Sequence, residues 1–151
     1  MPDYIISDTS CIIIFSKIDA LEILFKTYSE IIITPEVAKE YGKKLPDWIK
    51  IIAAKNKEKQ KEFEELVDLG EASAIALAVE LPESILIIDD KRGRRLAHKL
   101  KLDITGTLGT LLKAKNQKII PEIKPYIDKL RQINYRITKV IEEEVLRKAG
   151  E

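Results

Sequence analysis

The chain has very little of the two residue types that build most catalytic and transition-metal sites. Its 151 residues include one cysteine, Cys11, and one histidine, His98. A single cysteine excludes an internal disulfide, and the two residues together exclude a cysteine-rich zinc site and any catalysis that needs two histidines. Any metal ion must therefore be bound by oxygen atoms, as Mg²⁺ prefers.

Long hydrophobic runs and an excess of one charge are also missing. The longest apolar run, Cys11 to Phe15, is far too short to cross a membrane, and Asp3 and Asp8 interrupt the N-terminal region. We therefore expect no membrane span and no signal peptide, and a cytoplasmic protein. Because 26 Lys and Arg residues balance 25 Asp and Glu residues, nucleic acid could bind only to a local basic patch.

The length and composition predict one domain over residues 1–151. A hydrophobic content of 45% in a chain of this length supplies one core and is too little for two comfortable domains. Short segments that read as strands, at 4–7, 31–33, 49–54, 85–88 and 103–105, alternate with helical patterns. Such alternation predicts an α/β fold with a parallel sheet and right-handed crossovers, so the carboxyl ends of the strands share one edge.

Acidic residues follow the clearest of these strands directly. Ile85 to Ile88 is a continuous, mostly β-branched run, typical of a strand buried on both faces of a sheet. Asp89 and Asp90 come next, and Lys91 to Leu100 has the pattern of a helix. Ligands of open α/β sheets bind beyond the carboxyl ends of the strands, so the pair is a candidate site. The alternative is that one aspartate only caps the helix.

Two further acids occupy comparable positions. Asp8 follows the strand from Tyr4 to Ser7 and begins a polar turn before an apolar helix predicted from Cys11 to Ile18. Its alternative role is to cap this helix through the turn. Glu40 lies three residues after Val37 in the helix predicted from Pro35 to Tyr41, near its buried face. The alternative for Glu40 is an ordinary solvated side chain.

Glu71 falls on the buried side of a helix predicted to reach about Leu81. It shares a stripe with Ile75, Ala78 and Val79. An acid in the first turn complements the helix dipole, but a solvent-facing position would do so at lower cost. We therefore expect Glu71 to have a partner, and we expect converging carboxylates to repel one another and to show raised pKa values.

Ordered motifs along nearly the whole chain resemble the PIN domain, and within it a prokaryotic group related to VapC-type toxins. The motifs are Tyr4–Ser10, Val37–Glu40, Gly70–Glu71, Leu86–Lys91 and Gly106–Gly109. The resemblance implies a three-layer α/β/α fold with strand order 3-2-1-4-5. It also implies a Mg²⁺ or Mn²⁺ site of clustered acids and endoribonuclease activity on single-stranded RNA.

The same resemblance assigns individual residues. By position, four acids match the catalytic quartet of the family: Asp8, Glu40, Glu71 and Asp90. The implied metal ligands are Asp8, Glu71 and Asp90, with Asp89 as an additional or competing acid, and Ser10 matches a small polar residue near the metal. Phosphodiester hydrolysis needs an activated water and a counter-charge, and a divalent ion supplies both.

Three basic residues of the helix after Asp90 are candidates for RNA binding: Arg92, Arg95 and Lys99. They could contact phosphates, and the alternative is a solvated helix face. A two-fold homodimer is expected because the apolar helices at 19–26 and 35–41, with a long C-terminal helix, carry more apolar surface than one thin sheet covers. The resemblance adds an antitoxin as a further partner if the protein is a toxin. A non-catalytic nucleic-acid-binding or regulatory PIN protein is the alternative function.

Overall fold

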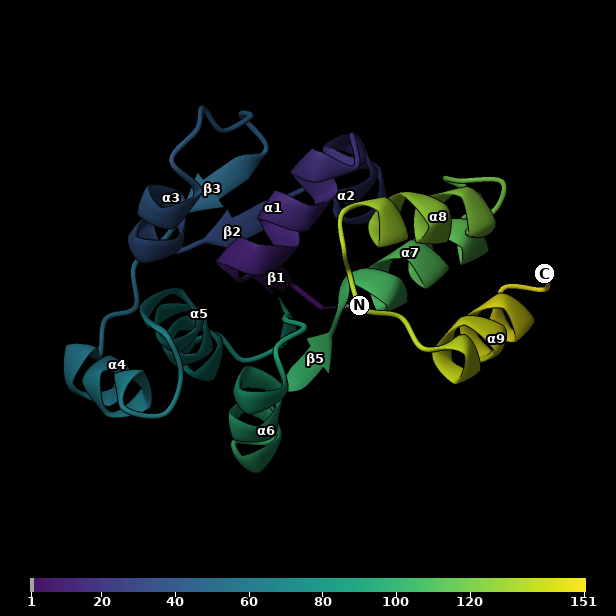
Figure 1. Cartoon of the computed structure of the whole chain (residues 1–151). Helices are drawn as coiled ribbons and strands as arrows, with labels where there is room; N and C mark the ends of the chain where they lie inside the picture. The colour runs from purple at the N-terminus through teal and green to yellow at the C-terminus, as the bar shows by residue number, and fades with distance from the viewer. Residues whose placement is uncertain (1) are drawn as a thin grey trace.

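Five parallel strands form one sheet at the centre of the protein (Figure 1). The computed structural model describes residues 2–151. The strands are β1 (Tyr4–Ser7), β2 (Ile31–Ile33), β3 (Ile49–Ile51), β4 (Ser84–Ile87) and β5 (Asp103–Thr105). Their order is β3-β2-β1-β4-β5, with every neighbouring pair parallel. This confirms the predicted α/β class and the strand order 3-2-1-4-5.

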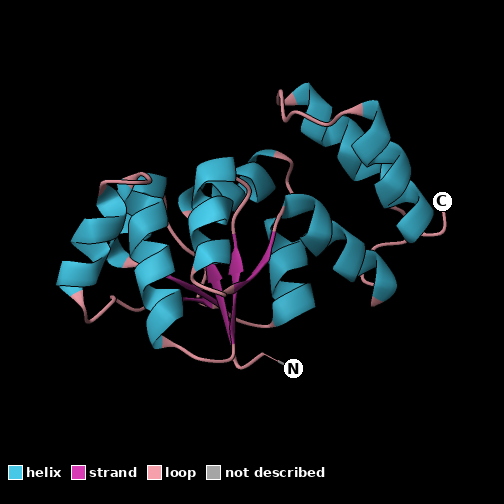
Figure 2. Ribbon diagram, turned by 90° about the horizontal axis from the view of Figure 1, so that it is seen from below, coloured by secondary structure: helices cyan, strands magenta, loops and turns pink. Residues whose placement is uncertain are grey.

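Helices cover both faces of the sheet (Figure 2). Those before β4 are α1 (Thr9–Lys17), α2 (Leu21–Tyr28), α3 (Pro35–Tyr41), α4 (Lys57–Glu64) and α5 (Leu69–Glu80). The later ones are α6 (Lys91–Lys99), α7 (Thr107–Asn116), α8 (Lys124–Gln132) and α9 (Lys139–Lys148). No helix among residues 2–151 has the length and apolar character needed to cross a membrane.

Alternation along the strands divides the core into two layers. Ile5 of β1 packs in a cluster with residues of α1, α2, α7 and α8, whereas Ile6 packs on the opposite face with residues of α5 and α6. Successive strand residues point to opposite faces of a sheet, so a run of consecutive isoleucines serves both layers. The result is the three-layer α/β/α arrangement that the sequence predicts.

The register of the two central strands places the acidic residues together. Ser7 of β1 lies opposite Ile87 of β4. Asp8 and Asp89 therefore leave the sheet close to one another, one residue and two residues beyond this pair. The common edge predicted for the two strand-to-acid junctions is present.

Several helix boundaries follow from caps that the sequence shows. Thr34 accepts a hydrogen bond from the backbone N–H of Val37 at 3.2 Å, Pro35 takes the first turn of α3, and Gly42 ends it with φ at 69°. The helix predicted to start at Cys11 starts at Thr9 instead, because Asp8 is its cap. The predicted polar turn after Asp8 is thus the first turn of α1.

One predicted strand is shorter than expected, since the strand predicted at 49–54 ends at Ile51. In the C-terminal part of the chain, α8 begins at Lys124 and α9 at Lys139. Thr138 caps α9 by accepting a hydrogen bond from the N–H of Ile141.

Candidate active site

Asp8 is a fully buried carboxylate at the end of the central strand. Its Oδ1 accepts a hydrogen bond from the backbone N–H of Cys11 at 3.0 Å and so caps α1, whereas its Oδ2 has no hydrogen-bond partner. The pKa of Asp8 is raised to about 7, chiefly by burial and to a smaller extent by the nearby charges of Asp89 and Asp68. The capping role weighed from the sequence is therefore real, and it leaves one oxygen of Asp8 for another ligand.

Glu71 lies in the first turn of α5 and is also buried. Burial raises its pKa to about 7, and the charges of Asp68, Asp90 and Asp8 add to this effect. Asp68 caps α5 by accepting a hydrogen bond from the N–H of Glu71 at 2.9 Å. The side chains that act on Glu71 are thus other acids, which repel its charge. Raised pKa values are found at Asp8 and Glu71, where burial is the larger cause and repulsion between carboxylates adds to it.

The two consecutive aspartates after β4 have different environments. Asp90 is exposed and caps α6, because its Oδ2 accepts hydrogen bonds from the N–H groups of Arg92 at 3.0 Å and Gly93 at 3.1 Å. Its charge acts on Glu71. The capping alternative therefore holds for Asp90, and the cap places its carboxylate beside Glu71.

Asp89 connects the end of β4 to the start of α7. Its Oδ1 accepts a hydrogen bond from the N–H of Thr107 at 2.9 Å, and its Oδ2 accepts one from the Thr107 hydroxyl at 2.6 Å. The thiol of Cys11 also donates to Oδ2, at 3.6 Å. Gly106 permits this approach, because a Cβ at that position would overlap with Asp89 Oδ1. Both oxygens of Asp89 are therefore engaged by the protein itself.

Glu40 lies on the exposed side of α3 and joins the edge of the site. Its Oε1 accepts a hydrogen bond from the Thr9 hydroxyl at 2.8 Å. Gly70 makes room for it, because a Cβ there would overlap with Glu40 Oε1. Glu40 is thus exposed to solvent, which agrees with the alternative weighed from the sequence. It is also held toward the start of α5. Ser10 is exposed in the first turn of α1, and the hydroxyl that contacts an acid is that of Thr9.

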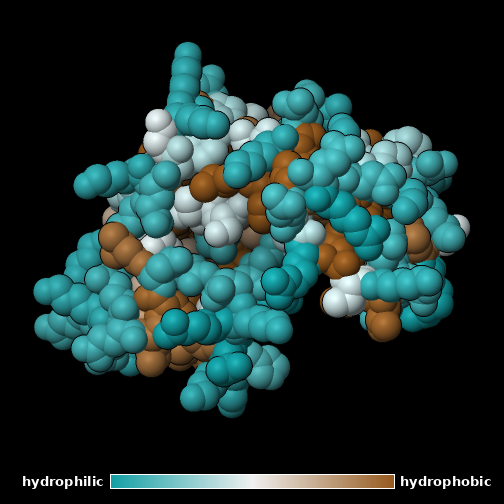
Figure 3. All heavy atoms as spheres, viewed as in Figure 1, coloured by the Kyte–Doolittle hydropathy of each residue, from teal (hydrophilic) through white to brown (hydrophobic). Residues whose placement is uncertain are grey.

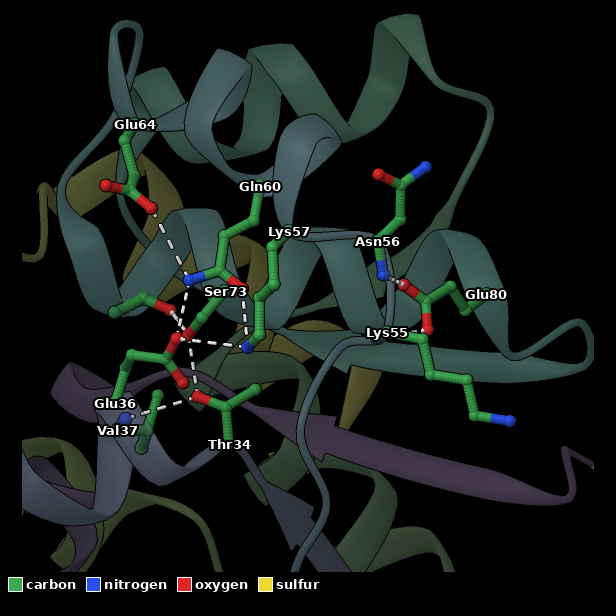
Figure 4. A network of polar contacts seen from close by, with 11 residues as sticks. Thr34, Glu36, Val37, Lys55, Asn56, Lys57, Gln60, Glu64, Ser73 and Glu80 are labelled. Carbon is green, nitrogen blue, oxygen red and sulfur yellow. Dashed lines mark hydrogen bonds and ion pairs between the residues drawn. The ribbon is translucent and has the colours of Figure 1, made fainter.

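A polar network fixes the relative positions of α3, α4 and α5 (Figure 4). The hydroxyls of Thr34 and Ser73 lie 2.6 Å apart, and Ser73 donates to the carbonyl of Gly70 at 2.8 Å. The buried Gln60 of α4 donates to Glu36 of α3 at 2.5 Å. Because Glu40 and Glu71 stand on α3 and α5, this network holds the two acids on either side of the Gly70 contact.

Three residues at the site were missed by sequence reasoning: Asp68, Thr107 and Tyr135. Asp68 had a signal, since an acid three residues before Glu71 at a helix start places both side chains at the same helix end. Thr107 binds Asp89 from 18 residues away. Tyr135 comes from the segment between α8 and α9, and burial together with the charge of Asp89 raises its pKa. The motif Gly106–Gly109 marked the segment that holds Thr107 but not its contact with Asp89, and nothing in the sequence indicated Tyr135.

The basic residues predicted to bind RNA lie on one face of α6. Arg92, Arg95 and Lys99 are exposed and line a pocket of about 270 Å³ together with Leu66 and Leu96. The pocket lies next to the cap formed by Asp90.

The donor atoms fit an oxygen-bound divalent ion. Within residues 2–151, no three acidic, cysteine or histidine side chains stand close enough together to hold a metal ion by themselves. Mg²⁺, however, is usually bound by one or two carboxylates and completes its shell with waters and substrate phosphates. Asp8 Oδ2 is a buried acceptor without a partner, and repulsion among Asp8, Asp68 and Glu71 is what a bound cation would relieve.

Comparison with known proteins identifies the family. A family model described as a PIN domain matches residues 4–151, which is nearly the whole chain. The chain therefore belongs to the PIN-domain family, whose members are generally nucleases. A search of curated proteins found no match.

Proposed function

We propose that the protein is a metal-dependent endoribonuclease that hydrolyses phosphodiester bonds of single-stranded RNA. The observation that carries this proposal is Asp8, a fully buried carboxylate with one unpartnered oxygen and a pKa of about 7. Perturbed acids of this kind are typical of functional sites. Membership of a family of nucleases supports the same assignment.

The four acids of the quartet have separate tasks in this proposal. Asp8 and Glu71, with Asp90 near Glu71, would hold a Mg²⁺ or Mn²⁺ ion, which would supply counter-charge and an acidified water. Asp89, which the resemblance placed among the metal ligands, has a supporting task in this proposal, because it accepts hydrogen bonds from Cys11 and Thr107 and so orients these two side chains. Glu40 would accept a hydrogen bond from the substrate at the exposed edge of the site. In the structure the Thr9 hydroxyl donates to this carboxylate.

The test is incubation of the purified protein with a mixed pool of structured and unstructured RNA. Cleavage of unstructured RNA is expected with Mg²⁺ or Mn²⁺ and none is expected in chelator. If cells that express the protein also stop growing, and an Asp8→Asn variant does not stop them, the protein acts as a toxin and an antitoxin partner is implied.

The second candidate is a non-catalytic PIN protein that binds or regulates RNA. It is favoured by one observation, namely that residues 2–151 hold no ready-made group of three metal ligands. RNA binding without cleavage at any metal concentration would select this candidate over the nuclease.

Charge reversal on α6 tests the RNA interface. Arg92→Glu with Arg95→Glu should weaken binding of single-stranded RNA by about tenfold or more at low salt, because two phosphate contacts are lost. The slope of log affinity against log salt should become shallower by about 1.4. The measurement is fluorescence anisotropy across a salt series.

The matched control for this experiment carries the same change of charge far from the site. Lys139→Glu with Arg147→Glu reverses two exposed charges on α9. An equal loss of affinity in both variants would mean that only net charge matters, and would return α6 to the role of a solvated helix face.

Exposed apolar residues around Phe25 form a candidate surface for the expected homodimer. Phe25 of α2 packs on Trp48 with ring centroids 5.5 Å apart and remains exposed, as do Ile51 and Ile52 at the edge of the sheet. α3 offers little apolar surface to such a dimer, because Val37 and Tyr41 are buried within the protein. We propose a two-fold dimer through Phe25 and its neighbours. Light scattering should give a dimer at micromolar concentration and a monomer for Phe25→Lys.

A further inference from the structure

We infer that the pocket between α6 and the turn joining α4 to α5 binds one unstacked nucleotide of the RNA chain beside the acidic site. The nucleobase lies against Leu66 and Leu96, and the flanking phosphates contact the basic residues of α6. This inference rests on the proposed function, since it names the part of the substrate that lies next to the cleavage site.

Leu66 is an apolar side chain held at the surface by an ordered turn. Its backbone N–H and that of Val67 both donate to the carbonyl of Phe63, at 2.9 Å and 3.0 Å. Phe63 and Val67 are buried and anchor the turn, whereas 52% of Leu66 is exposed. The turn therefore presents Leu66 outward as one wall of the pocket, opposite Leu96 of α6. In Figure 3, hydrophobic atoms reach the surface between the places of α4 and α6.

The rest of the lining is cationic. Arg92, Arg95 and Lys99 project from one face of α6 because they are spaced by three and four residues. No acid lines the pocket. An apolar wall faced by three cations complements a nucleotide, which combines a flat base with an anionic phosphate, and arginine can also stack on the base.

Two acids of the site stand close in sequence to the residues that line the pocket. Asp68 follows Leu66 by two residues, and Asp90 precedes Arg92 by two residues. These two acids both act on Glu71. In the inferred arrangement, the phosphodiester bond next to the bound nucleotide lies on the side of these carboxylates, where cleavage would take place.

The size of the pocket indicates a single nucleotide. Its volume of about 270 Å³ is below the ~300–1,000 Å³ of pockets that enclose drug-sized ligands. A base can enter only if it is unstacked from its neighbours, so the inferred pocket predicts a preference for single strands. An apolar, acidic peptide of a partner protein has similar complementarity, and the experiment below separates the two.

The test measures binding in chelator, so that cleavage plays no part. A short unstructured RNA is compared with a series in which one abasic site is moved along the chain. For the wild-type protein, one position of the abasic site should weaken binding by about fivefold, which corresponds to about 1 kcal/mol of lost apolar contact. Leu66→Ser should bind the intact RNA with that weaker affinity and should no longer respond to the position of the abasic site.

Val79→Ser is the matched control, because Val79 is 42% exposed at the opposite end of α5 and does not line the pocket. It should behave like the wild-type protein. If Leu66→Ser also behaves like the wild-type protein, or if no RNA binds, the inference is overturned, and a peptide becomes the better occupant. If the expected binding pattern appears but metal never produces cleavage, the nuclease proposal fails and the nucleotide pocket stands.

Discussion

Asp8→Asn is expected to abolish metal-dependent RNA cleavage while the protein stays folded. Asparagine keeps the shape of the side chain and caps helices as well as aspartate does, so the hydrogen bond from Cys11 to Oδ1 survives. What is lost is the negative charge and the ligand capacity of Oδ2. Replacing groups that only orient a metal ligand costs about 10–100-fold, so removing a ligand should reduce the cleavage rate by more than ~100-fold.

The measurement is the initial rate of cleavage of unstructured RNA at saturating Mg²⁺ or Mn²⁺, with circular dichroism to show that the variant is folded. Asp47→Asn is the control, because Asp47 is an exposed aspartate in the loop before β3. A folded Asp8→Asn variant that cleaves at the rate of Asp47→Asn would remove Asp8 from the active site.

The second large effect concerns stability and pH in the absence of metal. The folded protein holds protons on Asp8 and Glu71 up to about pH 7, whereas the unfolded chain releases them at about pH 4. Between these values the folded state binds more protons than the unfolded state. The free energy of unfolding should therefore fall as the pH rises from about 4 to about 7, and should change little with these groups above that range.

Asp8→Asn should remove much of this loss. A rise in the pKa of Asp8 from 3.8 to about 7 corresponds to at most about 4 kcal/mol. The unpartnered amide that asparagine leaves costs about 1–3 kcal/mol in return. We expect the variant to be about 1–3 kcal/mol more stable than the wild-type protein at pH 8, with no such gain at pH 4. Urea unfolding in chelator across this pH range measures the difference.

Two comparisons complete this test. Asp47→Asn should follow the wild-type curve, because Asp47 is exposed. Added Mg²⁺ or Mn²⁺ should stabilise the wild-type protein at pH 8 and stabilise Asp8→Asn less, since binding to the folded state alone raises stability. Parallel pH curves for wild type and Asp8→Asn would mean that Asp8 carries no raised pKa.

The sequence predicted those parts of the fold and site that depend on neighbouring residues. Ile85 to Ile88 is too short and too β-branched for a helix, and Thr34 with Pro35 is a complete helix start, so both elements were predicted almost to the residue. Asp8 was placed correctly at the strand end because the alternation of elements fixes which sheet edge carries it.

What the sequence could not predict depends on contacts between distant segments. The length of α1 was misjudged because Asp8 is both the strand end and the helix cap, and local patterns do not separate these roles. The different environments of Asp89 and Asp90 arise from Thr107, which reaches one and not the other. The helical position of Glu40 allowed it to be an ordinary solvated side chain. The absence of a side chain at Gly70, which lets Glu40 approach α5, could not be foreseen from local patterns.

Cys11, the only cysteine of the chain, can serve as a chemical probe of the site. Cys11 is fully buried between Asp8 and Asp89, and burial with these two charges raises the pKa of its thiol, so it is inert toward alkylating reagents while the protein is closed. Any modification must therefore pass through an opening of the junction between α1 and α7. Because no second thiol competes, the alkylation rate reads the free energy of that opening directly, in the way that amide exchange does for a backbone N–H.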